Sequence, residues 1–444
     1  MAKKIYLGNE RPIRKNFTGW ILAVLFLVVA AGAVYFFVPT LQERVTWHLE
    51  QWYTRILYFV KPPEKVVFDP SRVTEAPDPR EANAAMTLEA SNSGIPTLEP
   101  TPTLIPLPTL TATTSPLPLE VDLKGVRYMD QHGLYNYCGP ANLAMLLSYW
   151  KWEGDRIDVG KYAEPYRKDK NVMPYELADY VSEKTDLNII IRVGGDIDTI
   201  KRFLAGGFPV MIEKGAFIVD INGVLSWMGH YNVITGYKEA DKLFIVQDSY
   251  FGENQKMSYE KILGEWRAFN FLYMVAFTYN RYNEIISILG EDAEENTNYL
   301  RAANKSSNEI VALEGIDKFF AWWNRGDNLA ELQDYGNAAN CFDEAFKMYP
   351  TIPEDQRPWR VMWYRTGPYK AYYGVGRYQA IIDLATTTLD AMSEPYLEES
   401  YYWRARAEWE LGNDQAAIAD FRKSLDLHPK FGPTLYQMEL LGIK

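Results

Sequence analysis

Cys138 is one of only two cysteines in this 444-residue chain, and it stands where a thiol could be activated. It is followed by Gly139, by Pro140 and by an apolar run, so the thiol is expected at the N-terminus of a helix. The partial positive charge at that end lowers the pKa of a thiol, and the thiolate is the form that attacks. Cys138 is therefore a candidate nucleophile, although a cysteine before a helix is more often structural.

A histidine and an aspartate in two consecutive predicted strands could supply the base that this nucleophile needs. His230 opens a strand predicted over 230–237, and Asp248 ends the next one. If these strands form a hairpin that turns near residues 239 and 240, position 230 pairs with 248 or 249. The Asp248 carboxylate would then orient the His230 imidazole for proton transfer with the cysteine. The alternative is a histidine that is hydrogen-bonded within the sheet and has no catalytic role.

Gln131 lies in a short predicted loop before Cys138. If the loop folds back, the Gln131 side-chain amide and the Cys138 backbone N–H could form an oxyanion hole for a tetrahedral intermediate. A solvent-exposed loop glutamine is the alternative.

The other chemistry-bearing residues indicate neither a metal site nor a disulfide framework. The histidines, none of which has a metal-binding spacing, are His48, His132, His230 and His428. Cys341 lies far from Cys138, in a predicted repeat helix where a small buried side chain is expected. The formal net charge of −12 argues against nucleic-acid binding. We therefore expect no metal, no cofactor and no nucleic-acid partner.

Several short motifs occur together and in order across residues 121–280. They are Gln131, Tyr137-Cys138-Gly139-Pro140-Ala141-Asn142, Gly207-Phe208-Pro209-Val210, Gly229-His230-Tyr231, Thr235-Gly236-Tyr237 and Gln247-Asp248-Ser249. This set resembles the papain-like cysteine peptidases of the bacteriocin-processing, double-glycine-leader family, in particular their stand-alone peptidase-like branch. The resemblance implies catalytic roles for Gln131, Cys138, His230 and Asp248. Ser249 departs from the family pattern, in which a proline commonly follows the aspartate.

The periodicity of residues 121–280 predicts an α+β domain, which is the fold class of that family. Helices are predicted over 140–150, 174–183 and 198–204, and strands over 188–193, 209–213, 230–237 and 242–247. Connecting helices are expected over 281–318.

Residues 319–444 have the spacing of tetratricopeptide repeats, which form an all-α solenoid. One copy is marked by Trp322, Gly326, Ala338, Phe342, Ala345 and Pro350, and another by Ala405, Gly412, Ala417, Phe421 and Pro429. A degenerate repeat is expected between the two copies. Such repeats predict a protein partner.

The N-terminal region predicts a membrane anchor. A basic tail at 1–17 is followed by a charge-free span at 18–38, which has the length of one transmembrane helix. The positive-inside rule then places the tail in the cytoplasm and the folded domains outside the plasma membrane. An amphipathic juxtamembrane helix is predicted over 39–60, and a Pro/Thr-rich linker over 61–120. A cleaved signal peptide is the alternative to an anchor.

These expectations combine into a membrane-anchored cysteine peptidase or amidase that acts on a peptide or protein substrate, with repeats that recruit a partner. The alternative is a catalytically inactive papain-like domain that serves as a peptide-binding scaffold on the cell surface.

Overall fold

The computed structural model describes residues 39–60 and 116–443, apart from 167 and 220–222, together with isolated residues between 20 and 35. The chain divides into two units, one ending at Ile56 and the other starting at Leu57, and each is considered by itself. Most of the predicted transmembrane span at 18–38 and of the linker at 61–120 falls outside the described residues. Both stay predictions.

Helix α2 (Pro39–Val60) covers the range in which an amphipathic helix was expected. On its predicted apolar face, Leu49, Trp52 and Phe59 are exposed. Among the described residues, no helix is both long and apolar enough to cross a bilayer.

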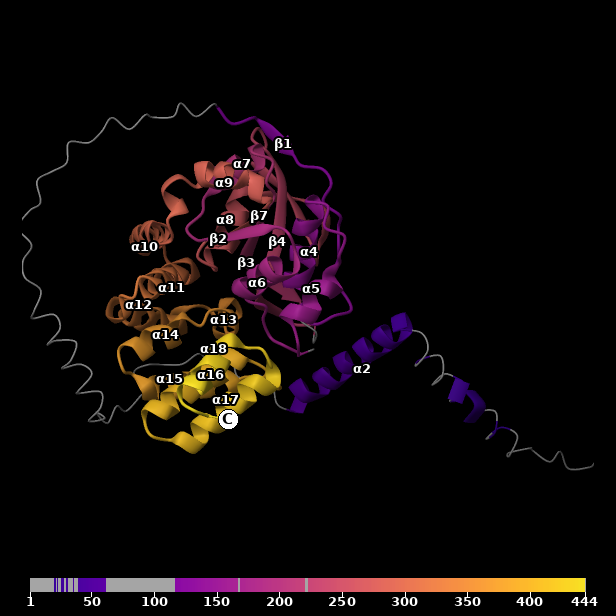
Figure 1. The fold of residues 1–444 in the computed structure, drawn as a ribbon, viewed down its shortest axis with the longest axis vertical. Helices are drawn as coiled ribbons and strands as arrows, with labels where there is room; N and C mark the ends of the chain where they lie inside the picture. The colour runs from indigo at the N-terminus through magenta and orange to yellow at the C-terminus, as the bar shows by residue number, and fades with distance from the viewer. Residues whose placement is uncertain are drawn as a thin grey trace, which may run out of the picture. The chain divides into compact units, whose positions relative to one another are not determined.

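The second unit is built on a seven-stranded antiparallel sheet with the order β2-β7-β3-β4-β5-β6, in which β1 pairs with β4 (Figure 1). The strands are β1 (Glu120–Asp122), β2 (Asn188–Arg192), β3 (Val210–Val219), β4 (Leu225–Lys238), β5 (Leu243–Asp248), β6 (Gly252–Ser258) and β7 (Tyr273–Phe277).

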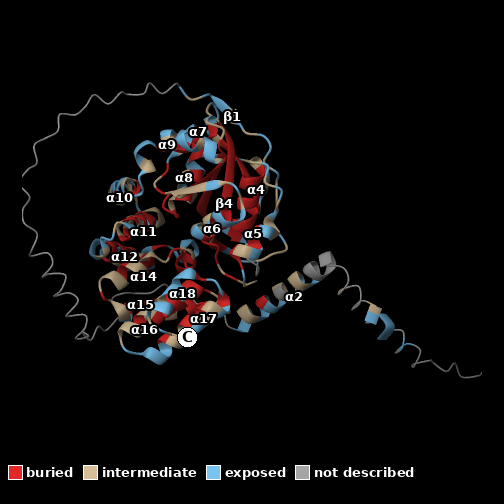
Figure 2. Cartoon of the chain, viewed as in Figure 1, coloured by how far each residue is buried: buried red, intermediate tan, exposed pale blue. Residues whose placement is uncertain are grey.

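Helices cover both faces of this sheet, because its central strands are apolar on both sides. Met211 faces the helices α4 (Cys138–Tyr149), α5 (Arg156–Ala163) and α6 (Pro174–Lys184). Its neighbour Val210 faces α7 (Ile197–Ala205), α8 (Tyr259–Arg267) and α9 (Tyr282–Leu289). This alternation follows from the period of two along a strand. The central strands are accordingly buried (Figure 2).

The predicted α+β class is confirmed, and each predicted helix and strand of this region has a counterpart. Strand β4 begins before His230, at Leu225, and β3 extends to Val219. Helices α5 and α8 and strands β1, β6 and β7 were not predicted from the sequence. Strand β6 has a mostly polar sequence, and β7 is a five-residue buried run that periodicity alone cannot assign to a strand.

The predicted pairing of position 230 with 248 or 249 is wrong. The turn between β4 and β5 lies between Lys238 and Leu243, and a β-bulge between Ile234 and Gly236 shifts the register. The ladder beyond the bulge ends with Val233 opposite Gln247, so His230 lies outside it. A bulge inserts a residue that a constant-sum argument cannot anticipate.

The C-terminal part is a succession of helices. They are α10 (Glu295–Ala312), α11 (Gly315–Glu331), α12 (Tyr335–Met348), α13 (Val361–Tyr364), α14 (Gly367–Gly374), α15 (Tyr378–Asp390), α16 (Glu398–Glu410), α17 (Asp414–Leu427) and α18 (Gly432–Leu440). Helices α11 and α12 approach closely at Gly326, where an added Cβ would lie 2.8 Å from the Phe342 ring. Antiparallel helix pairs of this kind are what the repeat spacing predicted.

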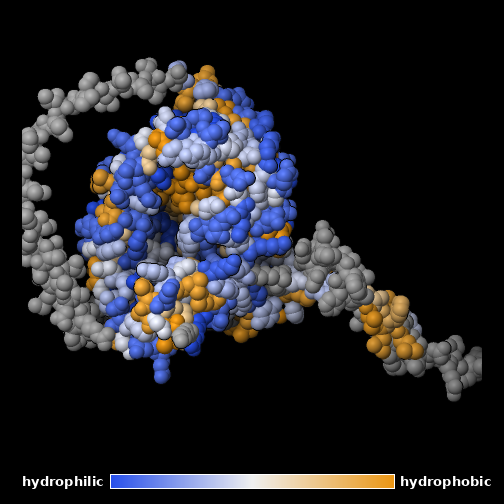
Figure 3. Space-filling view, viewed as in Figure 1, coloured by the Kyte–Doolittle hydropathy of each residue, from blue (hydrophilic) through white to orange (hydrophobic). Residues whose placement is uncertain are grey.

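The repeats and the sheet domain share a hydrophobic core. Trp227 at the start of β4 stacks on Phe320 of α11, with ring centroids 5.6 Å apart, and both belong to one buried cluster. The Arg365 guanidinium donates to the Ala268 carbonyl oxygen at 2.7 Å. On the face drawn in Figure 3, hydrophilic side chains cover most of both parts. Because they share this core with the sheet domain, the repeats are not an independently packed module.

Candidate active site

His230 and Asp248 come together at the edge of the sheet where β5 ends. His230 Nε2 lies 2.8 Å from Asp248 Oδ1, and each side chain is only 1% exposed. The expected couple is therefore present through a side-chain contact, although the strand pairing is not the one predicted. Because Nε2 is engaged by the carboxylate, Nδ1 is the ring nitrogen left for proton exchange with a thiol.

The Asp248 carboxylate is held by several donors. Besides the imidazole, its Oδ1 accepts hydrogen bonds from the backbone N–H groups of Tyr250 at 2.9 Å and Phe251 at 3.0 Å. Burial raises the pKa of this carboxyl, but His230, the nearby Lys214 and the Phe251 N–H outweigh that effect and hold its pKa well below the usual value. Asp248 is thus a fixed anion beside the imidazole.

Cys138 is the first residue of α4 and remains partly exposed. Burial of its thiol raises the pKa to about 12, although the backbone N–H groups of Tyr231 and Gly139 act to lower it and Glu164 and Glu213 act to raise it. The expectation of a lowered pKa is therefore wrong for this structure. It counted the helix N-terminus but could not anticipate the desolvation.

The thiol, on α4, lies beside the stretch of β4 that carries the imidazole, because the Tyr231 N–H that acts on Cys138 belongs to the residue directly after His230. Within the described part of the chain, no hydrogen bond joins Cys138 to His230. The two side chains are thus neighbours without a preformed ion pair. Catalytic hydrogen bonds are often long before substrate binds.

Gln131 belongs to a hydrogen-bonded chain that fixes its side-chain amide. The Ser249 hydroxyl donates to Gln131 Oε1 at 2.8 Å, and Asn142 Nδ2 donates to Ser249 Oγ at 2.8 Å. Asn142 Nδ2 also donates to the Cys138 carbonyl oxygen at 2.8 Å. Because Gln131 Oε1 accepts the hydrogen bond from Ser249, the NH2 group of the same amide can donate to another acceptor, such as an oxyanion. The sequence analysis treated Ser249 as a departure and did not single out Asn142 as a positioning residue.

Two buried ionisable residues of β3 were also not predicted from the sequence. Lys214 pairs with His230 across β3 and β4, and its ammonium lies 2.7 Å from the Glu265 carboxylate. Glu213 pairs with Tyr231, and burial raises its pKa to about 8 despite the opposing effects of Arg365 and Tyr231. The sequence pattern of β3 does not reveal these residues, because a strand that is buried on both faces has no solvent-facing side on which charged residues would be expected.

The repeats reach the site through Tyr364 at the end of α13. An added Cβ at Gly229, directly before His230, would lie 3.0 Å from Tyr364 Cδ1 and 2.8 Å from Phe269 Cζ. The Cys138 thiol is close enough to act electrostatically on the Tyr364 hydroxyl. Glycine at 229 is therefore required by close packing, and a repeat-borne ring forms part of the wall near the site.

The four predicted site residues thus gather in one region, as a His230–Asp248 pair, a nearby thiol and an oriented glutamine. The described residues also contain a second group of ionisable side chains, Glu176, Glu398 and His428, that could hold a metal ion. It lies on α6 and in the repeats.

Comparisons with known proteins agree with the division of the chain into a sheet domain and a repeat region. Residues 123–274 match the Peptidase C39 like family, and residues 319–352 and 398–431 match tetratricopeptide repeats. A curated relative, aryl-hydrocarbon-interacting protein-like 1 from Bos taurus, is 28% identical over 111 residues, which cover 23% of this chain and 34% of that protein. The chain therefore spans about a third of the length of that relative.

A crystal structure of a C39-like peptidase from Bacillus anthracis is also similar, with a TM-score of 0.30 and 17% identity. The similarity covers 36% of this chain and 98% of that chain. The family matches, rather than this overall similarity, identify the two parts of the protein.

Proposed function

Because the chain contains a C39-like peptidase domain followed by tetratricopeptide repeats, we propose that it is a cysteine peptidase or amidase with a Cys-His-Asp site. Cys138 is the nucleophile and His230 is its base. Asp248 holds the imidazole in one tautomer. Gln131 supplies an oxyanion donor together with the Cys138 backbone N–H.

The reaction starts from a neutral thiol, because burial raises the pKa of Cys138. His230 Nδ1 takes the thiol proton as sulfur attacks the substrate carbonyl carbon, and the developing oxyanion accepts hydrogen bonds from Gln131 and the Cys138 N–H. The imidazolium then gives its proton to the leaving amine. Water, deprotonated by His230, hydrolyses the thioester and restores the free thiol.

The contact of 2.8 Å between His230 Nε2 and Asp248 Oδ1 is the observation that carries this proposal. It leaves Nδ1 as the ring nitrogen that serves the thiol, beside the first residue of α4. A carboxylate that accepts several N–H bonds keeps its charge and so stabilises the imidazolium formed in the first step.

The test is covalent labelling of the full chain with an electrophilic thiol probe, followed by incubation with a mixture of peptides. Label should be found on Cys138, and Cys138→Ala should abolish both labelling and hydrolysis while the fold is kept. Cys341→Ser is the matched control, because that thiol is buried beside Arg325. Hydrolysis that survives Cys138→Ala would disprove the assignment.

The second candidate is an inactive domain that binds peptides as a scaffold. It is favoured by the raised pKa of Cys138 and by the missing hydrogen bond between Cys138 and His230 among the described residues. A protein that binds peptides without cleaving them, and whose thiol does not react with the probe, would favour this reading.

We also propose that the repeats recruit a protein partner and that residues 18–38 anchor the chain in the plasma membrane with its folded domains outside. The exposed apolar side chains of α2 support a membrane-surface position for that helix. Protease added to intact cells should cut near Pro100. A cut seen only after lysis would reverse the orientation.

A further inference from the structure

The second ionisable group joins the peptidase domain to the last tetratricopeptide repeat. Glu176 lies in α6, Glu398 opens α16 and His428 directly follows α17. Two carboxylate oxygens converge on one imidazole nitrogen, since His428 Nδ1 lies 3.2 Å from Glu398 Oε1 and 3.3 Å from Glu176 Oε1. Glu176 is 4% exposed and Glu398 1%.

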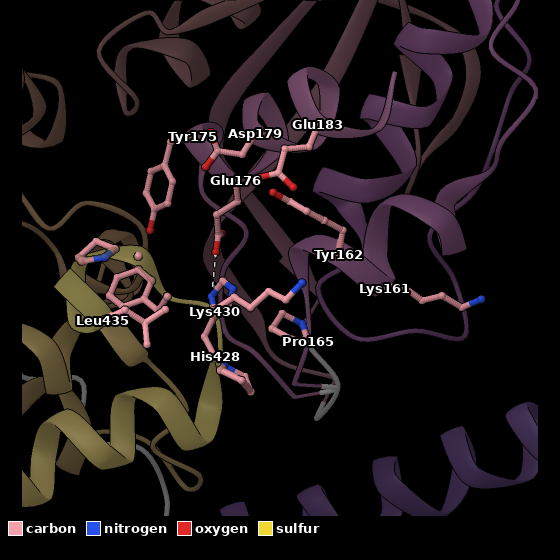
Figure 4. Close-up of a pocket in the computed structure, with 14 residues that line it drawn as sticks. Lys161, Tyr162, Pro165, Tyr175, Glu176, Asp179, Glu183, His428, Lys430 and Leu435 are labelled. Carbon is pink, nitrogen blue, oxygen red and sulfur yellow. Dashed lines mark ion pairs between the residues drawn. The ribbon is translucent and has the colours of Figure 1, made fainter. Parts of the chain in front are cut away.

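A single proton on the imidazole does not satisfy this arrangement. Nδ1 carries at most one hydrogen, so it can donate to only one of the two carboxylates. Glu176 Oε2 is used by the Met173 N–H at 2.7 Å, whereas Glu176 Oε1 is buried without a hydrogen-bond partner among the described residues and points at the imidazole (Figure 4). One buried acceptor is therefore left over.

The distances fit a shared cation better than a direct ion pair. A charge-assisted N–H···O bond is usually about 2.7–2.9 Å long. Nitrogen and oxygen ligands about 2.0–2.2 Å from a tetrahedral ion stand roughly 3.3–3.5 Å apart. The two contacts to His428 lie close to that second value, and all three ligand atoms lie within 4.8 Å of one another.

The site is reachable from solvent. Glu176 and His428 line a cavity of about 890 Å³ whose wall also carries Asp179 and Glu183 (Figure 4). Lys161 and Lys430 line the same cavity, so the two carboxylates of its wall are balanced by two positive charges. The cavity would also admit a water molecule as a fourth ligand.

We infer that Glu176, Glu398 and His428 form a binding site for a divalent transition-metal ion of the zinc class, which ties the peptidase domain to the repeats. One imidazole and two carboxylates suit such an ion, whereas calcium and magnesium prefer oxygen ligands alone. Spacing along the chain predicted no metal site, because these three ligands come from three separate elements. The site is independent of the proposed hydrolase activity.

The test uses the full chain without an affinity tag, freed of metals by a chelator and titrated with Zn²⁺ in competition with a chromophoric chelator. We expect one tight equivalent and a rise in the melting temperature, with Mg²⁺ producing neither. His428→Gln should weaken the site by at least about 100-fold, because loss of a partner that only orients a ligand already costs about 10- to 100-fold. Glu183→Gln, in the cavity wall, should change the affinity less than about threefold if it only attracts the ion.

Two further measurements keep the inference testable if His428→Gln does not fold. Glu398→Gln should also weaken Zn²⁺ binding, and Co²⁺ added to the wild-type chain should give the strong visible absorption of a tetrahedral site. A wild-type chain that binds no Zn²⁺ would overturn the inference and leave a protonated His428 as the bridge. Binding that folded His428→Gln and Glu398→Gln variants both retain would overturn it as well.

Discussion

The active site around Asp248 and the carboxylate cluster between α6 and the repeats both contain buried acidic side chains. The pKa values of these acids are shifted in opposite directions in the two regions. Asp248 has a pKa held far below its usual value, since His230 and two backbone N–H groups donate to it. At the other place, burial raises the pKa of Glu164 and Glu399 well above the usual value, with neighbouring glutamates adding to the effect. Burial alone therefore does not decide the charge state of an acidic side chain, because the hydrogen-bond donors around it also shift its pKa.

This comparison separates a site that is organised to keep a charge from one that is short of positive charge. Gln131, Ser249 and Asn142 are joined by hydrogen bonds in the first region, and the atom left without a hydrogen-bond partner among the described residues is the neutral amide oxygen Asn142 Oδ1. In the second region, Glu164 and Glu399 each have a buried oxygen without a hydrogen-bond partner among the described residues. A chain of hydrogen bonds fixes geometry, as a catalytic site requires, whereas buried carboxyl oxygens without donors leave a need for a proton or a metal ion.

Within the hydrogen-bonded chain of Gln131, Ser249 and Asn142, the largest effect is expected from removing the proposed oxyanion donor. Gln131→Ala should lower the turnover number by on the order of 10² to 10³, because the lost hydrogen bond acts mainly in the transition state. The Michaelis constant should change little. Steady-state kinetics on a peptide found by library screening would measure both, and an unchanged turnover number would remove Gln131 from the mechanism.

A smaller loss is expected when only the orientation of that glutamine is disturbed. Ser249→Ala removes the hydroxyl that holds Gln131 Oε1, and turnover should fall by roughly tenfold, the equivalent of about 1.4 kcal/mol. In a Gln131→Ala background, the same change should have almost no further effect. Additive losses in the double variant would mean that Ser249 acts on something else.

The two regions should respond in opposite directions when a carboxylate is made neutral. Asp248→Asn should reduce the free energy of unfolding by about 1–3 kcal/mol at pH 7, since a charged acceptor of three hydrogen bonds is lost. Its stabilising effect is present above the unfolded-state pKa and disappears as the pH falls. Thermal unfolding at pH 7 would measure the loss, and a series from about pH 5 down to about pH 2 would follow its disappearance.

Glu164→Gln is the counterpart, and it should leave the protein equally or more stable at pH 7. A carboxyl whose pKa is raised in the folded state stabilises the fold only while it is protonated, and this contribution is lost as the pH rises. The wild type should therefore lose stability relative to the variant between pH 4 and pH 8. A variant that is less stable at pH 7 would show that the charged form of Glu164 is paired.

The sequence predicted the elements that carry the site, because each signal was local. The helix after Cys138, the two strands at His230 and Asp248 and the repeat spacing are all readable over ten to forty residues. The bulge near Thr235, the packing of Tyr364 on Gly229 and the convergence of Glu176 with His428 are not. They depend on contacts between distant segments, and burial that raises the pKa of Cys138 is likewise a tertiary effect.

The start of the folded part is held to the sheet domain by two hydrogen bonds. A chain that begins at Pro116 should match the full chain in melting temperature. One that begins at Glu120 should lose about 1–3 kcal/mol, because the Pro118 and Leu119 carbonyls accept from Tyr237 and from the Glu239 N–H. Equal stability of the two shortened chains would show that these bonds contribute nothing.

The pH dependence of Cys138 alkylation in the wild type and in His230→Ala tests the central claim most directly. In His230→Ala, the rate should rise about tenfold per pH unit between pH 6 and pH 10, as expected for a thiol whose pKa is about 12. In the wild type, base assistance by His230 should make the rate at pH 7 larger by on the order of 10²-fold, with the difference shrinking as the pH rises. Two profiles that coincide across this range would contradict the account, because the imidazole would then not take the thiol proton.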